Sequence, residues 1–167
     1  IFTRPLIDAE DLMTNFFSSN YKVIHLPTLS INSANMEPIN AKEFDGLIFT
    51  SANAVRFLKL KNDEKNIKCF CVGNITERSL RLKGFTNTVA ASGTVNALKN
   101  IILNSEKKIK NLAYLCGDVV SYDLDKDLKL SGFKVKKIIN YTSSKITDLN
   151  SESLDLIKKY PPDVTLI

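Results

Sequence analysis

The chain has 167 residues, of which 44% are hydrophobic and 25% charged, a composition typical of a globular protein with one or two domains. No apolar run is long enough for a transmembrane helix, and no secretory signal is visible. The formal net charge of +5 suits an anionic partner, but the basic residues are scattered and no nucleic-acid motif accompanies them. We therefore expect a cytoplasmic protein that binds neither nucleic acid nor membranes.

The predicted strands and helices alternate, as hydrophobic patterns of period two and of helical period follow one another along the chain. Gly84 and Gly132 follow two of the helices and are good helix stops. In chain order the elements are a strand at 1–3, a helix at 8–18, a strand at 22–26, a strand at 45–49, a helix at 52–60, a strand at 68–72, a helix at 75–83, a strand at 87–90, a helix at 95–103, a strand at 112–116, a helix at 122–130, a strand at 133–139, a helix at 153–159 and a strand at 164–167. This alternation predicts an α/β fold with parallel sheets covered by helices on both faces.

Two extended segments, 26–31 and 138–142, flank a compact middle, and the polar stretch 32–40 resembles a linker. An inserted domain explains this pattern. We expect residues 1–31 to form the first part of an outer domain with a connecting strand. Residues 32–137 would be an inserted α/β domain, and 138–167 a second connecting strand and the continuation of the outer domain. The outer domain is then expected to be incomplete in this chain, since too little of its sheet is present to bury both faces.

The residue types exclude several kinds of site. Cys69, Cys71 and Cys116 lie within apolar strand patterns, which indicates buried, reduced thiols. His25 is the only histidine, so neither a zinc cluster nor a Ser-His-Asp triad is supported. The glycines at 73 and 117 do not belong to a dinucleotide fingerprint or a P-loop.

In open α/β sheets ligands bind beyond the carboxyl ends of the strands, so the turns that follow strands are the candidate binding residues. Arg4 follows the first strand, and either pairs with a carboxylate or lies exposed before a helix. Ser51 and Asn53 follow the strand at 45–49, where Ser51 is a natural helix N-cap as well as a possible ligand group. Gly73 and Gly117 follow two further strands and would let a ligand approach the backbone closely.

Together these motifs resemble the uroporphyrinogen-III synthase family. The resemblance begins with TRP at 3–5 and is strongest in the run DGLIFTSANAVRFL. It continues at family-like spacing over the whole chain in four more motifs, which are CVGNITERSLRLKGF from Cys71, SGTVNAL from Ser92, YLCG from Tyr114 and GFKVKKIINYTS from Gly132.

The resemblance implies a fold of two flavodoxin-like parallel-sheet domains, one inserted in the other and joined by a two-stranded ladder. It also implies the activity: hydroxymethylbilane, a linear polycarboxylate tetrapyrrole, is cyclised with inversion of its last pyrrole ring and loss of water. Members of the family use no metal or organic cofactor and are generally monomeric. A polycarboxylate suits backbone N–H groups and a modestly basic protein.

The resemblance also assigns roles to individual residues. Tyr141 matches the family's tyrosine on the connecting ladder and would assist departure of the substrate hydroxyl; the alternative is a hinge tyrosine that only packs. Thr76 and Ser51 match positions that face the substrate, and we assign both to binding because no base is available to activate them.

A second hypothesis belongs to another class of protein. An α/β chain without a catalytic triad, metal site or nucleotide motif could be a non-catalytic binding module for a small polyanion. Binding of such polyanions without turnover would favour this alternative.

Overall fold

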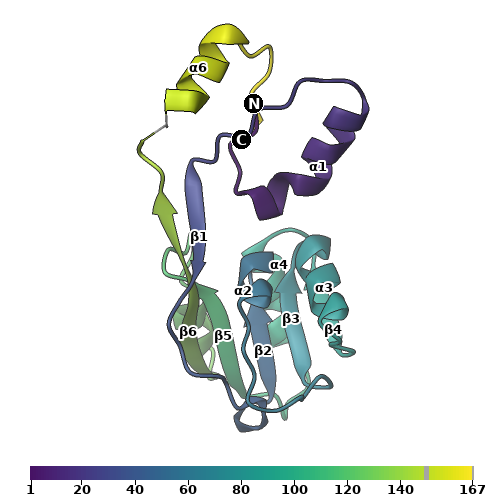
Figure 1. Ribbon diagram of the computed structural model, residues 1–167. Coiled ribbons are helices and arrows are strands. Elements are labelled where there is room, and N and C mark those ends of the chain that lie inside the picture. The colour runs from purple at the N-terminus through teal and green to yellow at the C-terminus, as the bar shows by residue number, and fades with distance from the viewer. Residues whose placement is uncertain (149–150, 167) are drawn as a thin grey trace. The chain divides into compact units, whose positions relative to one another are not determined.

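The computed structural model describes residues 1–148 and 151–166, and the chain divides into two compact units (Figure 1). The larger unit is Ser33–Thr142, and the smaller unit joins Ile1–Asn32 to Ser143–Ile167. The end of the strand expected at 164–167 lies outside the described residues.

The larger unit is built on a parallel sheet, which confirms the predicted α/β class. Its strands stand in the order β6-β5-β2-β3-β4, and each neighbouring pair is parallel. When the five strands of this unit are numbered 1 to 5 in chain order and read from β4, their order is 3-2-1-4-5. The flavodoxin-like fold expected from the resemblance has the order 2-1-3-4-5, so the strand order differs from that expectation. Both orders belong to the doubly wound class. The strands are β2 (Gly46–Phe49), β3 (Lys68–Val72), β4 (Thr88–Ala91), β5 (Asn111–Gly117) and β6 (Lys134–Lys145).

Helices cover both faces of this sheet, because successive side chains of a strand point to opposite faces. On one face, Ile48 and Tyr114 pack with side chains of α4 (Val95–Leu103) and α5 (Leu124–Leu130). The other face packs against α2 (Ala52–Arg56) and α3 (Gly73–Leu82). Because helices cover β2 on both faces, all four of its residues are buried. A strand covered in this way has a continuous apolar sequence rather than an alternating one. The three cysteines are buried and free, as predicted.

The bounds of β3 and α4 agree with the sequence prediction, but α2 ends four residues earlier than expected. Carbonyl groups at the end of α2 and just beyond it accept hydrogen bonds from distant side chains, in place of the N–H groups of a further helical turn. The Lys83 ammonium donates to the carbonyls of Arg56 and Leu58, at 2.9 and 3.4 Å. The Leu58 N–H donates to the Val55 carbonyl rather than to that of Ala54. The Ala54 carbonyl accepts instead from Asn140 Nδ2. A pattern of apolar spacing carries no information about such distant donors.

The smaller unit contains α1 (Leu6–Ser18) and α6 (Ser151–Lys159). The strands expected at 1–3 and 22–26 are reduced here to isolated parallel bridges, in which Phe2 pairs with His25 on one side and Leu166 on the other. Phe2 is nonetheless buried, and its ring meets Phe16 of α1 edge-on, with centroids 5.6 Å apart.

The strand β1 (Leu29–Ser33) lies next to β6 in the sheet order. The Ala34 N–H donates to the Asn140 carbonyl, and the Ile146 N–H donates to the Thr28 carbonyl. Because one residue number rises as the other falls, the two segments run antiparallel. Strand β6 (Lys134–Lys145) therefore joins the strand expected at 133–139 to the extended segment expected at 138–142, and its second half pairs with the β1 segment.

Candidate functional site

A polar cavity of about 160 Å³ opens at the carboxyl ends of β2 and β5. This is the point at which the winding of the sheet reverses, since the chain proceeds from β2 to one edge and from β5 to the other. Open α/β sheets bind ligands at such a switch point. Hydroxyl groups dominate the lining, which consists of Thr50, Ser51, Val95, Tyr114, Gly117, Val119, Val120, Ser121, Tyr122 and Tyr141.

Three of the predicted site residues, Ser51, Gly117 and Tyr141, line this cavity together. Tyr141 lies beside Gly117 in the parallel β5–β6 ladder, and its ring covers the glycine. A Cβ atom placed on Gly117 would meet Tyr141 Cε2 and Cζ at 2.7 Å and the hydroxyl oxygen at 3.0 Å. Tyr141 also stacks on Phe57, with ring centroids 6.4 Å apart and an interplanar angle of 28°. The absence of a side chain at Gly117 therefore leaves the room that the Tyr141 ring occupies.

None of the described residues that line the cavity is an acidic residue, a basic residue or a histidine. The hydroxyls of Tyr114 and Thr50 share a hydrogen bond of 3.1 Å, and burial raises the pKa of Tyr114 to about 12. Burial likewise raises the pKa of the neighbouring Cys116 thiol to about 11. Both groups are protonated at neutral pH, so neither supplies an anionic nucleophile. The cavity offers hydrogen-bond donors and acceptors rather than a covalent catalyst.

An ionic cluster anchors the wall formed by residues 118–122. Tyr122 donates to the Asp127 carboxylate, which also accepts from the Lys99 ammonium at 2.7 Å. These hydrogen bonds, that of Lys99 first, lower the pKa of Asp127, and the one from Tyr122 raises the pKa of that phenol. The wall is thereby tied to α4 and α5.

The turn after β2 is organised locally. The Ser51 hydroxyl accepts from the Asn53 N–H at 3.1 Å, which confirms Ser51 as the N-cap of α2. The Asn53 side chain accepts from the Arg56 guanidinium within the same helix. Asn53 does not line the cavity, although it lies two residues from Ser51.

The remaining predicted residues lie elsewhere. Gly73 begins α3 with φ +77°, in the left-handed region, where a side chain would be strained. Thr76 is 4% exposed, in the first turn of that helix. Arg4 is exposed in the smaller unit, where its carbonyl meets His25 Nε2 at 2.8 Å. None of the three lines the cavity at the switch point.

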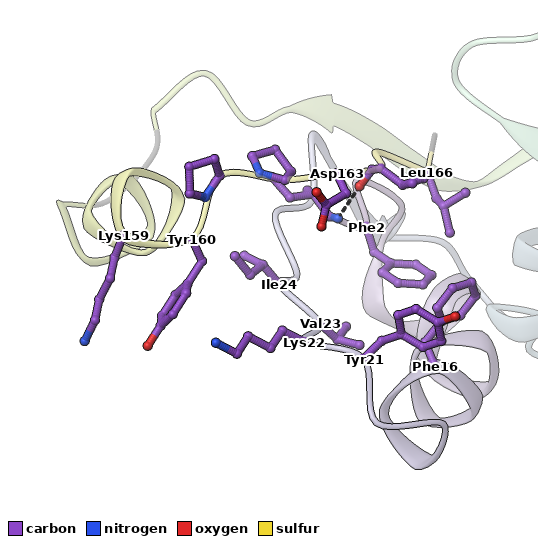
Figure 2. A pocket seen from close by; sticks show the side chains of 14 residues that line it. Phe2, Phe16, Tyr21, Lys22, Val23, Ile24, Lys159, Tyr160, Asp163 and Leu166 are labelled. Carbon is purple, nitrogen blue, oxygen red and sulfur yellow. Dashed lines mark hydrogen bonds between the residues drawn. The ribbon is translucent and has the colours of Figure 1, made fainter.

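The smaller unit has a cavity of its own, of about 430 Å³ (Figure 2). Its lining is mainly aromatic and aliphatic, and includes Phe2, Phe16 and Ile24. Three charged residues, Lys22, Lys159 and Asp163, also line it, and Lys22 Nζ is 4.1 Å from the centre of the Tyr160 ring. This cavity gathers apolar surface rather than groups that could carry out a reaction.

Two findings concern the described residues, 1–148 and 151–166, as a whole. They contain no group of three or more His, Cys, Asp and Glu side chains placed to bind a metal ion. Within the same residues, no helix is both long enough and apolar enough to cross a membrane.

Tyr114 was not predicted as a site residue, and Thr50 was singled out only as part of the turn at 50–53. A tyrosine within the otherwise apolar strand β5 was the available signal, because a buried phenol needs a hydrogen-bond partner. Without the strand order, nothing indicated that this partner would be Thr50 at the end of β2.

Comparison with known proteins identifies a matching family and similar solved structures. The family described as uroporphyrinogen-III synthase HemD matches residues 11–167. The crystal structure of uroporphyrinogen-III synthetase from Helicobacter pylori 26695 is similar, with a TM-score of 0.58 and 21% identity over 82% of this chain and 64% of that one. A mutant uroporphyrinogen III synthase from the extremely thermophilic bacterium Thermus thermophilus has a TM-score of 0.54 and 16% identity, over 94% of this chain and 66% of that one.

At these identities the two structures show the shared fold. The chain spans slightly less than two thirds of the length of each of them. A search of curated protein sequences gives no significant match.

Proposed function

The chain belongs to the uroporphyrinogen-III synthase family, and from this premise we propose that it acts in tetrapyrrole biosynthesis as a lyase. The reaction is cyclisation of hydroxymethylbilane, with inversion of the last pyrrole ring and loss of water, to give uroporphyrinogen III. One observation carries the proposal: the Tyr141 phenol borders a small, neutral, hydroxyl-lined cavity at the switch point of the sheet.

Tyr141 is the proposed proton donor. The bond between the terminal methylene carbon and its hydroxyl oxygen breaks, and the hydroxyl leaves as water with the phenolic proton. The resulting protonated azafulvene is attacked by the substituted carbon of the last pyrrole ring, which gives a cationic spiro intermediate and closes the macrocycle. The bond between that carbon and its original methylene bridge then breaks, and the methylene bonds to the free α-carbon of the same ring, which inverts the ring. Loss of the proton from that α-carbon restores aromaticity and returns the proton to the Tyr141 phenolate. The reaction balances as an isomerising cyclisation with loss of one water.

The cavity suits the leaving group in size and polarity. Its volume of about 160 Å³ exceeds the roughly 30 Å³ that one water occupies in the liquid, so it can accept a hydroxymethyl or carboxymethyl group. Neutral hydroxyls such as those of Thr50 and Tyr114 can bind the departing water without stabilising the substrate's ground-state charge.

The carboxylate groups of the substrate are assigned to residues in the turns that follow the strands. We propose that Ser51 and Gly117 bind substrate beside Tyr141, and that Asn53, Gly73, Thr76 and Arg4 bind further carboxylate or pyrrole groups. The smaller unit would be part of the family's outer domain, and the larger unit the inserted domain. We also propose that the protein acts in the cytoplasm as a monomer, without a metal or organic cofactor.

A product analysis that resolves the two isomers of uroporphyrinogen tests the proposal. Hydroxymethylbilane closes spontaneously without inversion, so isomer I is the background product. We expect this chain to produce isomer III faster than that background. Production of isomer I alone, at the spontaneous rate, would contradict the proposal, and substrate binding without turnover would favour the binding module.

The role of Tyr141 has its own variant. Tyr141→Phe keeps the ring and its stacking on Phe57 but removes the proton, so kcat should fall by about 10²- to 10⁴-fold with little change in KM. Tyr21→Phe, at an exposed tyrosine outside the cavity, is the matched control and should retain wild-type kcat. A wild-type kcat for Tyr141→Phe would remove Tyr141 from the mechanism.

A further inference from the structure

Strand β6 contains an irregularity immediately before Tyr141. In its ladder with β5, Cys116 pairs with Ile139 and Gly117 pairs with Tyr141, so Asn140 is an extra residue opposite one step of β5. An insertion of this kind is a β-bulge, which bends a strand and redirects the side chain that follows it.

The bulge changes the face to which Tyr141 belongs. Ile138 and Tyr141 are three residues apart and would point to opposite faces of a regular strand. Both nevertheless pack on the same apolar cluster, which includes Phe49 and Leu115. The extra residue therefore places Tyr141 on the α2 side of the sheet, where it meets Phe57 and covers Gly117.

Asn140 is fixed by two long-range hydrogen bonds. Its side chain is fully buried and donates through Nδ2 to the Ala54 carbonyl of α2, at 2.6 Å. Its own carbonyl accepts from the Ala34 N–H at 3.1 Å. Asn140 Oδ1 is buried and has no hydrogen-bond partner among the described residues. An unpaired amide oxygen is costly in a core, so what this side chain contributes lies in the hydrogen bond that it donates to Ala54.

We propose that Asn140 is a positioning residue: its bond to Ala54 holds the bulge that places the Tyr141 ring over Gly117 and ties Tyr141 to the helix that Ser51 caps. The geometric part of this inference stands on the contacts above. Its consequence for turnover rests on the proposed function. Asn140 need not touch substrate, because it acts through the position of the phenol.

The first test is spectroscopic and needs no substrate. In the wild-type protein, NMR should show nuclear Overhauser effects between the Tyr141 ring protons and the α-protons of Gly117, which also experience a ring-current shift. Asn140→Leu is close in volume and removes the amide, so these signals should weaken or vanish. Asn104→Ala is the matched control, because Asn104 likewise donates Nδ2 to a helix carbonyl, that of Asn100 at 2.9 Å, and it lies in an exposed position.

The second test is kinetic. A displacement of the phenol by about 1 Å costs on the order of 10²-fold in kcat, so Asn140→Leu should lower kcat much more than it changes KM. In a Tyr141→Phe background the same substitution should cause little further loss, because the group it positions is already absent. Asn104→Ala should leave kcat unchanged in both backgrounds.

The outcomes separate this inference from the proposed function. Retention of the Gly117 signals in a folded Asn140→Leu protein overturns the inference, as does their absence from the wild type. Loss of the signals with unchanged kcat supports the positioning and refutes the catalytic role of Tyr141. If Asn140→Leu does not fold, Asn140→Ala and the wild-type spectrum decide the matter by the same criteria.

Discussion

The contact between Gly117 and Tyr141 makes Gly117→Ala a sharp perturbation of the site. The Gly117 backbone is not in the left-handed region, so alanine meets no conformational strain there. The added methyl group would instead lie 2.7 Å from two ring atoms of Tyr141. One methyl group therefore tests the position of the phenol without removing its proton.

The size of the effect follows from this distance. Ordinary carbon contacts begin near 3.4 Å, so the ring must retreat by about 0.7 Å and disturb its stacking on Phe57. A displacement of that size is expected to lower kcat by about tenfold to hundredfold. Overpacking a buried site also costs about 1–3 kcal/mol of unfolding free energy, which must be measured separately.

The assay combines isomer-resolved turnover with urea denaturation for Gly117→Ala and a matched core variant. Gly46→Ala places its methyl group 3.1 Å from Leu112 Cδ2 and from the Lys68 carbonyl, at the amino end of β2 and away from the cavity. It should be destabilised, yet retain the wild-type kcat per folded molecule. A difference in kcat between the two glycine variants then reports on the site rather than on stability.

The reasoning fails if Gly117→Ala folds and turns over like the wild type. It also fails if Gly117→Ala lowers kcat by the same factor in a Tyr141→Phe background, since displacement of the phenol could not then be the cause.

The remaining predictions concern stability, each measured by urea denaturation. Ser51→Ala removes the α2 N-cap and should cost about 1 kcal/mol, where no change would show that the cap is immaterial. Tyr114→Phe removes a buried hydroxyl from its hydrogen bond and should likewise cost about 1 kcal/mol. Hydrogen bonds from the backbone N–H groups of Lys110 and Asn111 lower the pKa of the Asp45 carboxyl, so its stabilising contribution is present above the ordinary Asp pKa and is lost as the pH falls through the lower folded value. The difference in unfolding free energy between the wild type and Asp45→Asn should therefore shrink as the pH falls from the ordinary Asp pKa through the lower folded value. A difference that does not depend on pH would contradict this account.

Much of the fold follows from the sequence alone. Alternating apolar periods predicted the α/β class, and the bounds of β3 and α4 were predicted as observed. Ser51 was recognised as an N-cap because capping depends on neighbouring residues only. The buried cysteines followed from their places in apolar strands. These are local properties, which the spacing of residue types is enough to determine.

The site was only partly predictable. Ser51, Gly117 and Tyr141 were identified from motifs and resemblance, and the structure brings all three to one cavity. Their contacts depend on strand order, which alternation of strands and helices does not reveal. The hydrogen bond between Thr50 and Tyr114 joins residues 64 positions apart in the sequence, and depends on β2 lying beside β5.

The early end of α2 and the aim of Tyr141 were decided by tertiary structure. An asparagine is costly inside an apolar sheet unless it finds a partner. For Asn140 that partner is the Ala54 carbonyl, 86 positions away, and only the folded chain brings the two together. The sequence by itself determined the succession of strands and helices in the larger unit and the types of residue at their ends. The tertiary structure determined which of those ends meet, because the pairing of distant polar groups depends on sheet order and register rather than on local pattern.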